Sequence, residues 1–269
     1  MSEPADQVDE FEGAIVLERS FSILIRNIVP IGLVSLIVMS PPYIILIVSN
    51  GIEFAALLSF LISPLLSYFV AALLSVMIVQ ILQGQPARLF QSVGRGVQAI
   101  FPVTLVALVA GSIWGVMTYG EFAWIVTSFS TSIWGSARLG VLSIISIPVV
   151  TIFGLYLLSL FWFAIPAAVL ESSFQFDLGR SVVLSKGYRK VACIFLVLVI
   201  ILNAAAHFIP VIASMGEYAS IAFSWVAASL VMAFSAIMAN VSYYRRCRVE
   251  SSIKASEQGA ARDLPAPRG

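Results

Sequence analysis

Six long stretches of the chain are almost entirely apolar, and shorter polar stretches separate them. They cover roughly residues 28–49, 54–82, 100–118, 141–170, 191–213 and 219–242. A helix needs about 20 apolar residues to cross the hydrocarbon layer of a membrane, which is about 30 Å thick. The pattern therefore predicts an all-α, polytopic membrane protein with six transmembrane helices.

The second and fourth stretches are longer than one perpendicular crossing requires. Pro64 lies in the second, and Pro148 and Pro166 lie in the fourth. Proline lacks a backbone N–H group, and its ring clashes with the preceding helical turn. We therefore expect kinks at these three positions.

Three stretches that lead into apolar spans align with one another without gaps. They are LERSFSILIRNIVPIGLVSL (17–36), LFQSVGRGVQAIFPVTLVAL (89–108) and LGRSVVLSKGYRKVACIFLV (178–197), and we call them the first, second and third matched segments. Each begins with leucine and has serine three residues later, and the first two share Pro30 and Pro102 at one position. The alignment predicts a threefold internal repeat of helical hairpins.

The first part of each matched segment mixes apolar and polar residues at helical spacing. In the second segment Arg95 and Gln98 belong to the polar stripe, and Val93 and Val97 to the apolar stripe. In the third segment the polar stripe contains Asp177, Ser181 and Ser185. Such helices lie in the membrane interface with the apolar face toward the acyl chains. The sequence thus predicts three amphipathic helices at the inner face, one before each ascending span.

Basic residues are confined to alternate loops. Every Lys and Arg except Arg138 falls in a terminal segment or in the loop after the second or fourth span. Because Lys and Arg favour the cytoplasmic side, both termini are predicted to be cytoplasmic. The acidic start, MSEPADQVDEFE, lacks the basic region of a signal peptide, so we expect the first span to be retained.

Composition agrees with a membrane protein. The 269 residues are 60% hydrophobic and 11% charged, with a net charge of +1 and a mean hydropathy of +1.00. Soluble domains carry about 25% charged residues. The near-neutral charge predicts no nucleic-acid partner. We expect a membrane domain over 13–248, with disordered polar tails over 1–12 and 249–269.

Two motifs resemble those of a known family. Residues 165–191, IPAAVLESSFQFDLGRSVVLSKGYRKV, contain a proline and VLE at the end of a span, then RS and L-x-x-G; the tail 241–250 reads VSYYRRCRVE. These motifs resemble the bacterial six-span family of the glycerophosphoryl diester phosphodiesterase membrane domain and the YciC-like integral membrane proteins. The resemblance implies a bacterial inner-membrane protein. It covers the membrane part only, because the polar segments are too short for a catalytic barrel of about 250 residues.

Four basic residues before the fifth span are candidate contacts for anionic lipid: Arg180, Lys186, Arg189 and Lys190. Each charge near an anionic membrane surface contributes about 1 kcal/mol to lipid attraction. A role as a topology anchor explains the same residues, and the two roles are compatible.

Asn203 and His207, the only histidine, are candidate intramembrane polar contacts in the fifth span. An ionisable group inside a membrane is a functional-site hypothesis by default. For His207 we favour a structural or interfacial role over proton or ligand binding, because no acid is nearby in the sequence. For Asn203 we favour hydrogen bonding between packed helices.

The motifs of hydrolases, metal sites and phosphate-binding loops are not found in the sequence. Our expectation is a protein with no enzymatic activity, cofactor or metal. The leading interpretation is a scaffold, accessory subunit or membrane-organisation factor that contacts lipids, another protein or a second copy. The alternative is a small permease or channel for an uncharged or amphiphilic, lipid-like solute that passes between the repeat units.

Overall fold

The computed structural model describes residues 5–48, 53–86, 88–113, 149, 151–171 and 178–262, and within these ranges all regular structure is helical. The labelled helices are α1 (Ala5–Arg26), α2 (Ile28–Val38), α3 (Ser40–Val48), α4 (Glu53–Leu82), α5 (Leu89–Gln98), α8 (Ala164–Leu170), α9 (Leu178–Ser185), α10 (Arg189–Ile212) and α11 (Glu217–Arg262). Two further helical stretches cover Ile100–Ile113 and Thr151–Leu170, and the second of these includes α8.

Among the residues that the structure describes, four helices are long and apolar enough to cross a membrane. They are Leu65–Leu82 within α4, Thr151–Leu170, α10, and Glu217–Val249 within α11. Two bent pairs pass the same test when each pair is taken together: Gly13–Arg26 with α2, and Phe90–Gln98 with Ile100–Ile113. The described part of the chain is therefore all-helical with four to six candidate spans, which is compatible with a multi-pass membrane protein.

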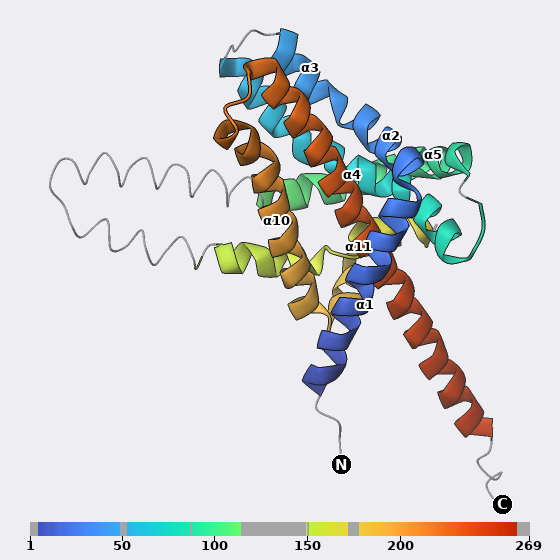
Figure 1. Cartoon of the computed structure of the whole chain (residues 1–269). Coiled ribbons are helices and arrows are strands. Elements are labelled where there is room, and N and C mark those ends of the chain that lie inside the picture. The colour runs from blue at the N-terminus through green and yellow to red at the C-terminus, as the bar shows by residue number, and fades with distance from the viewer. Residues whose placement is uncertain are drawn as a thin grey trace, which may run out of the picture.

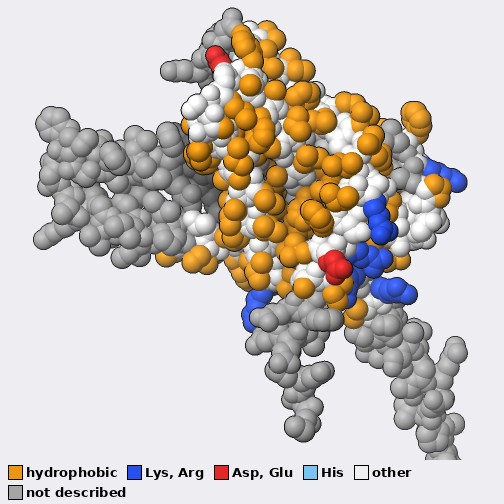
Figure 2. Space-filling view, in the orientation of Figure 1, with side chains coloured by type: hydrophobic (Ala, Val, Ile, Leu, Met, Phe, Trp, Pro, Cys, Tyr) orange, Lys and Arg blue, Asp and Glu red, His pale blue; other side chains and the backbone are white. Residues whose placement is uncertain are grey.

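α11 is the central helix of the fold. It packs against α1, α2, α3, α4, α8 and α10 (Figure 1). The start of α1 and the end of α11 lie at the same end of the molecule, opposite α3 (Figure 1). On the face shown in Figure 2, apolar side chains cover the upper part, and Lys and Arg side chains gather in the lower part, toward that same end.

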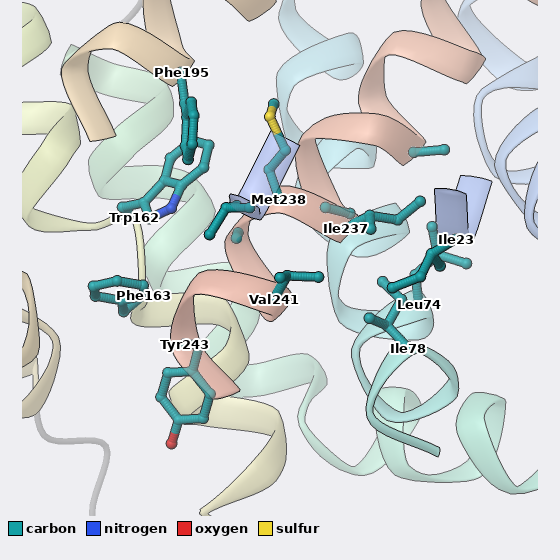
Figure 3. Close-up of a cluster of buried hydrophobic side chains, with 14 of the residues drawn as sticks. Ile23, Leu74, Ile78, Trp162, Phe163, Phe195, Ile237, Met238, Val241 and Tyr243 are labelled. Atoms are coloured by element: carbon teal, nitrogen blue, oxygen red, sulfur yellow. The ribbon is translucent and has the colours of Figure 1, made fainter. Parts of the chain in front are cut away.

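The core forms where α4, the Thr151–Leu170 span and α11 meet. Its buried side chains include Leu74, Ile78, Trp162, Phe163, Ile237 and Met238. Figure 3 shows these side chains together with Phe195 of α10, whose ring centroid lies 6.0 Å from that of Trp162. In an 18-residue window of the Thr151–Leu170 span 50% of residues are buried, against 17% in such a window of α10. The Thr151–Leu170 span thus belongs to the inside of the bundle, whereas most of α10 faces outward.

The backbone changes direction at one shared position in the three matched segments. The axes of Gly13–Arg26 and α2 differ by 87°, with the break at Asn27. Those of Phe90–Gln98 and Ile100–Ile113 differ by 67°, with the break at Ala99. In the third segment a turn follows α9, and Tyr188, at the position of Asn27 and Ala99, is the N-cap of α10.

Prolines explain several of these breaks. Pro30, Pro102 and Pro166 are each the third residue of a helical stretch that follows a break. The N–H groups of a first helical turn have no partner within the helix, so proline is tolerated there. Because proline has no N–H group, it cannot donate a hydrogen bond to a carbonyl of the preceding helix. The break before Pro166, a turn over 161–163, agrees with the kink expected there.

The other two expected kinks have different outcomes. α4 continues through Pro64 without interruption, as membrane helices often do when neighbouring groups satisfy the freed carbonyl. Pro148 lies outside the described residues. An additional break at Met39 precedes Pro41 and Pro42, which cannot donate to the carbonyls of the preceding turn.

The terminal helices extend into the segments for which composition predicts disorder. α1 begins at Ala5, and α11 ends at Arg262. Both segments contain Ala, Glu and Gln, which are good helix formers. A continuous helix therefore carries the chain beyond the boundaries expected at residues 12 and 249.

Candidate functional site

Parts of the chain that are distant in the sequence meet around Glu171, at the C-cap of α8. The Tyr243 hydroxyl of α11 donates to the Glu171 carboxylate at 2.5 Å. Arg180 of α9 donates to the same oxygen through Nε at 3.2 Å. Both members of this ion pair are about one-third exposed, so the pair orients the two side chains but adds little to the stability of the fold. One carboxylate thus joins the C-terminal end of α8 and the first turn of α9 to the middle of α11.

Tyr188 fills the centre of the same region and is fully buried. Its hydroxyl lies 2.8 Å from that of Ser242, and its ring centroid lies 5.5 Å from that of Phe163. The guanidinium carbon of Arg246 lies 5.2 Å from the ring centroid, a cation–π arrangement. We call Glu171, Tyr188, Ser242, Tyr243 and Arg246 the junction cluster.

Gly187 gives the junction its tight turn. Its φ of +85° lies in the left-handed region, which glycine adopts without steric cost. A β-carbon at this position would lie 3.6 Å from Nη2 of Arg246. The turn that carries Lys186 therefore lies beside Arg246, in the middle of α11.

The four predicted lipid contacts divide into two pairs. Arg180 binds Glu171, and Arg189 donates through Nη1 to the Tyr156 hydroxyl at 2.8 Å. Lys186 and Lys190 are exposed. Arg180 and Arg189 thus each bond to another side chain of the protein, and the side chains of Lys186 and Lys190 are at the surface.

The predicted polar stripe of the third segment faces inward, which corrects the expectation for α9. Ser181 and Ser185 are buried, and their hydroxyls donate to the carbonyls of Leu160 and Val182 at 2.8 and 2.9 Å. Asp177 lies outside the described residues. Because serine is small and can bond to backbone carbonyls, it allows close helix packing as readily as it faces water.

Serine occupies one equivalent, buried position in all three matched segments: Ser20, Ser92 and Ser181. The Ser92 hydroxyl donates to the Arg88 carbonyl of its own helix at 3.0 Å. The Ser20 hydroxyl has no hydrogen-bond partner in the described part of the protein. The position is therefore selected for small size, and only in the third segment does it bond to a different helix.

Asn203 and His207 are not part of the junction cluster. Asn203 is half-buried and His207 is exposed, both on α10. His207 lies about 27 Å along the helix from Arg189, at about 1.5 Å per residue. The structure thus places them in a separate region, on a largely outward-facing helix.

The junction residues on α11 were not among the predicted site residues. The resemblance to the six-span family could have indicated them, because it includes both the loop motifs VLE, RS and L-x-x-G and the segment VSYYRR. In the structure these two parts of the chain lie together. Comparisons with models of known protein families, with curated proteins and with solved structures find no match. The described part of the protein is all-helical with several candidate membrane spans. Because the comparisons find no match, its function has to be inferred from the fold and the junction cluster.

Proposed function

We propose that this is a non-enzymatic integral membrane protein that acts as a scaffold, accessory subunit or membrane-organisation factor through lipid and protein contacts. It has six spans in three hairpins, each preceded by an amphipathic helix at the cytoplasmic face, and both termini are cytoplasmic. The bacterial inner membrane, and membership of the six-span family, follow from the motifs at 169–171, 180–181 and 184–187.

Equivalent packing in the matched segments supports the threefold unit. Ile31, Val103 and Ala192 occupy one aligned position, and all three are fully buried. Their N–H groups bond to the carbonyls of the residues at the breaks, at 3.1, 3.0 and 2.9 Å. Similar burial and bonding at the same register favour a repeat over a chance alignment.

The observation that carries the scaffold interpretation is the apolar interior. Trp162, Phe163, Ile237 and Met238 are between 0% and 7% exposed and come from two of the central helices (Figure 3). A permease for a solute needs a polar, accessible path at this depth. Large apolar side chains fill this part of the described interior, which supports the scaffold interpretation.

One observation favours the permease alternative. The Asn240 Oδ1 and the Trp162 Nε1 are buried without a hydrogen-bond partner among the described residues. Buried polar atoms are usually satisfied, so a bound solute would meet this need. These two atoms are where such a solute would bind.

Mass spectrometry of the full chain, extracted in native-membrane discs, tests the choice. We expect a stoichiometric protein partner to copurify. A stoichiometric polar solute that is lost in Asn240→Leu but kept in the half-buried control Asn203→Leu would overturn the scaffold interpretation and support the permease. A tag at the C-terminus that is cleaved by protease only in inverted vesicles would support the cytoplasmic termini.

A further inference from the structure

The outward faces of the first two matched segments are apolar at equivalent positions. Ile25 and Val97 are 53% and 55% exposed, and Val29 and Phe101 are 74% and 71% exposed. Each pair occupies one place in the alignment and flanks a break. In both segments the chain therefore turns into its span with large apolar side chains facing outward.

The third segment places cations at the same positions. Lys186 corresponds to Ile25 and Val97, and Lys190 corresponds to Val29 and Phe101. Both lysines are exposed, as their apolar counterparts are. Exposed cations in place of exposed apolar side chains indicate that this surface meets a different part of the membrane.

A further cation lies against this surface. Arg246 lies beside the Gly187 turn and over the Tyr188 ring, and its Nε is buried without a hydrogen-bond partner in the described ranges. α10 begins here, and its first turn contains no acidic residue. Cations near the positive end of a helix dipole are unfavourable, and a bound anion would offset that cost.

Apolar groups border the cations. Val183 and Ile194, on either side of the turn in the sequence, are 63% and 62% exposed. A small water-soluble anion would make no apolar contacts with these groups. A phospholipid has both a phosphate for the cations and acyl chains for the apolar side chains. The pattern of cations beside exposed apolar groups fits an amphiphilic anion.

We propose that Lys186 and Lys190, with Arg246 beside them, bind the phosphate of an anionic phospholipid in the cytoplasmic leaflet. The corresponding apolar residues of the first two segments insert among acyl chains. The third segment is thus a specific lipid site, and the other two are general membrane contacts. This inference deepens the proposed function and rests on its membrane topology.

Native mass spectrometry of the full chain in discs of equimolar phosphatidylglycerol and phosphatidylcholine tests the proposal. The wild-type protein should retain phosphatidylglycerol in preference. Lys186→Gln with Lys190→Gln should reduce that preference by about fivefold for each lysine removed. Lys186→Arg with Lys190→Arg should keep it, which separates loss of charge from loss of fold.

The matched control removes two charges from the second segment. Arg88 and Arg95 are also exposed, so Arg88→Gln with Arg95→Gln changes the net charge equally. This variant should retain the preference. An unchanged preference in the lysine variant, or an equal loss in the control, would overturn the proposal.

Two further measurements separate the alternatives. Millimolar inorganic phosphate should not displace the phosphatidylglycerol, and displacement would identify a site for free phosphate instead. Protease access to the C-terminal tag reports orientation without reference to lipid. A cytoplasmic tag combined with no lipid preference would reject this site and leave the proposed topology standing.

Discussion

The second and third matched segments turn at the same position, yet different contacts hold the two turns. In the second, α5 packs closely on α4 through small residues, and a β-carbon on Gly96 would meet Leu73 Cδ2 at 2.7 Å. In the third, the large ring of Tyr188, at the break itself, packs against Phe163 and its hydroxyl bonds to Ser242, which joins α10 to α11. A similar change of direction can thus be stabilised by close approach or by aromatic filling, and substitutions can distinguish the two.

The largest loss of stability is expected from substitutions of Tyr188, at the turn of the third segment. Tyr188→Ala should lower the free energy of unfolding by about 3–5 kcal/mol, because it leaves a cavity among buried rings. Tyr188→Phe keeps the ring and should cost about 1 kcal/mol for the lost hydrogen bond to Ser242. Thermal unfolding of the purified protein in detergent measures both. Equal losses in the two variants would contradict aromatic filling.

Close packing in the second segment gives the next effect. Gly96→Ala should destabilise the protein by about 1–3 kcal/mol, since the new methyl group overlaps Leu73 and lies near its backbone. A methyl group added at Gly94 would meet nothing within 4 Å. Gly94→Ala should therefore be stabilising by up to about 1 kcal/mol through helix propensity. The two melting temperatures should move in opposite directions.

Backbone conformation gives a smaller effect in the third segment. Gly187→Ala forces a side chain into the left-handed region and should cost about 1–2 kcal/mol. A β-carbon at Gly216 would meet nothing within 4 Å, and Gly216 does not have a positive φ. Gly216→Ala is thus the control and should leave the unfolding temperature within a degree or two of wild type (about 0.5 kcal/mol or less). A loss as large as that of Gly187→Ala would argue against conformational strain.

The smallest expected difference lies at the equivalent serines. Ser181→Ala removes the hydrogen bond to the Leu160 carbonyl and should cost about 0.5–1.5 kcal/mol. Ser20→Ala removes a buried hydroxyl without a partner among the residues described and should be neutral or stabilising. Chemical denaturation of both variants in one detergent measures the difference. A greater loss at Ser20 would show that its hydroxyl has a partner.

The helices follow from the sequence because a run of about 20 apolar residues has few stable alternatives in a membrane. The break before Pro166 also follows from the sequence, because proline lacks the N–H group that would bond to the turn immediately before it. The threefold unit stays a prediction, supported by the common position of Asn27, Ala99 and Tyr188.

The junction cluster could not be derived in the same way. Whether Ser181 faces water or protein depends on how α9 is rotated against the Thr151–Leu170 span, and spacing within one helix does not determine that rotation. The contact between Glu171 and Tyr243 depends on where α11 passes α8. Motif residues in separate loops indicated importance, but only the assembled fold shows that they touch.

α11 is one uninterrupted helix of 46 residues, which at about 1.5 Å per residue is about 69 Å long. That is more than twice the thickness of a hydrocarbon layer of about 30 Å. α11 has no break between the core residues Ile237 and Met238 and its end at Arg262, so it has no hinge at which it could bend. A pull or twist applied to the far end would therefore be transmitted mechanically to the centre of the bundle.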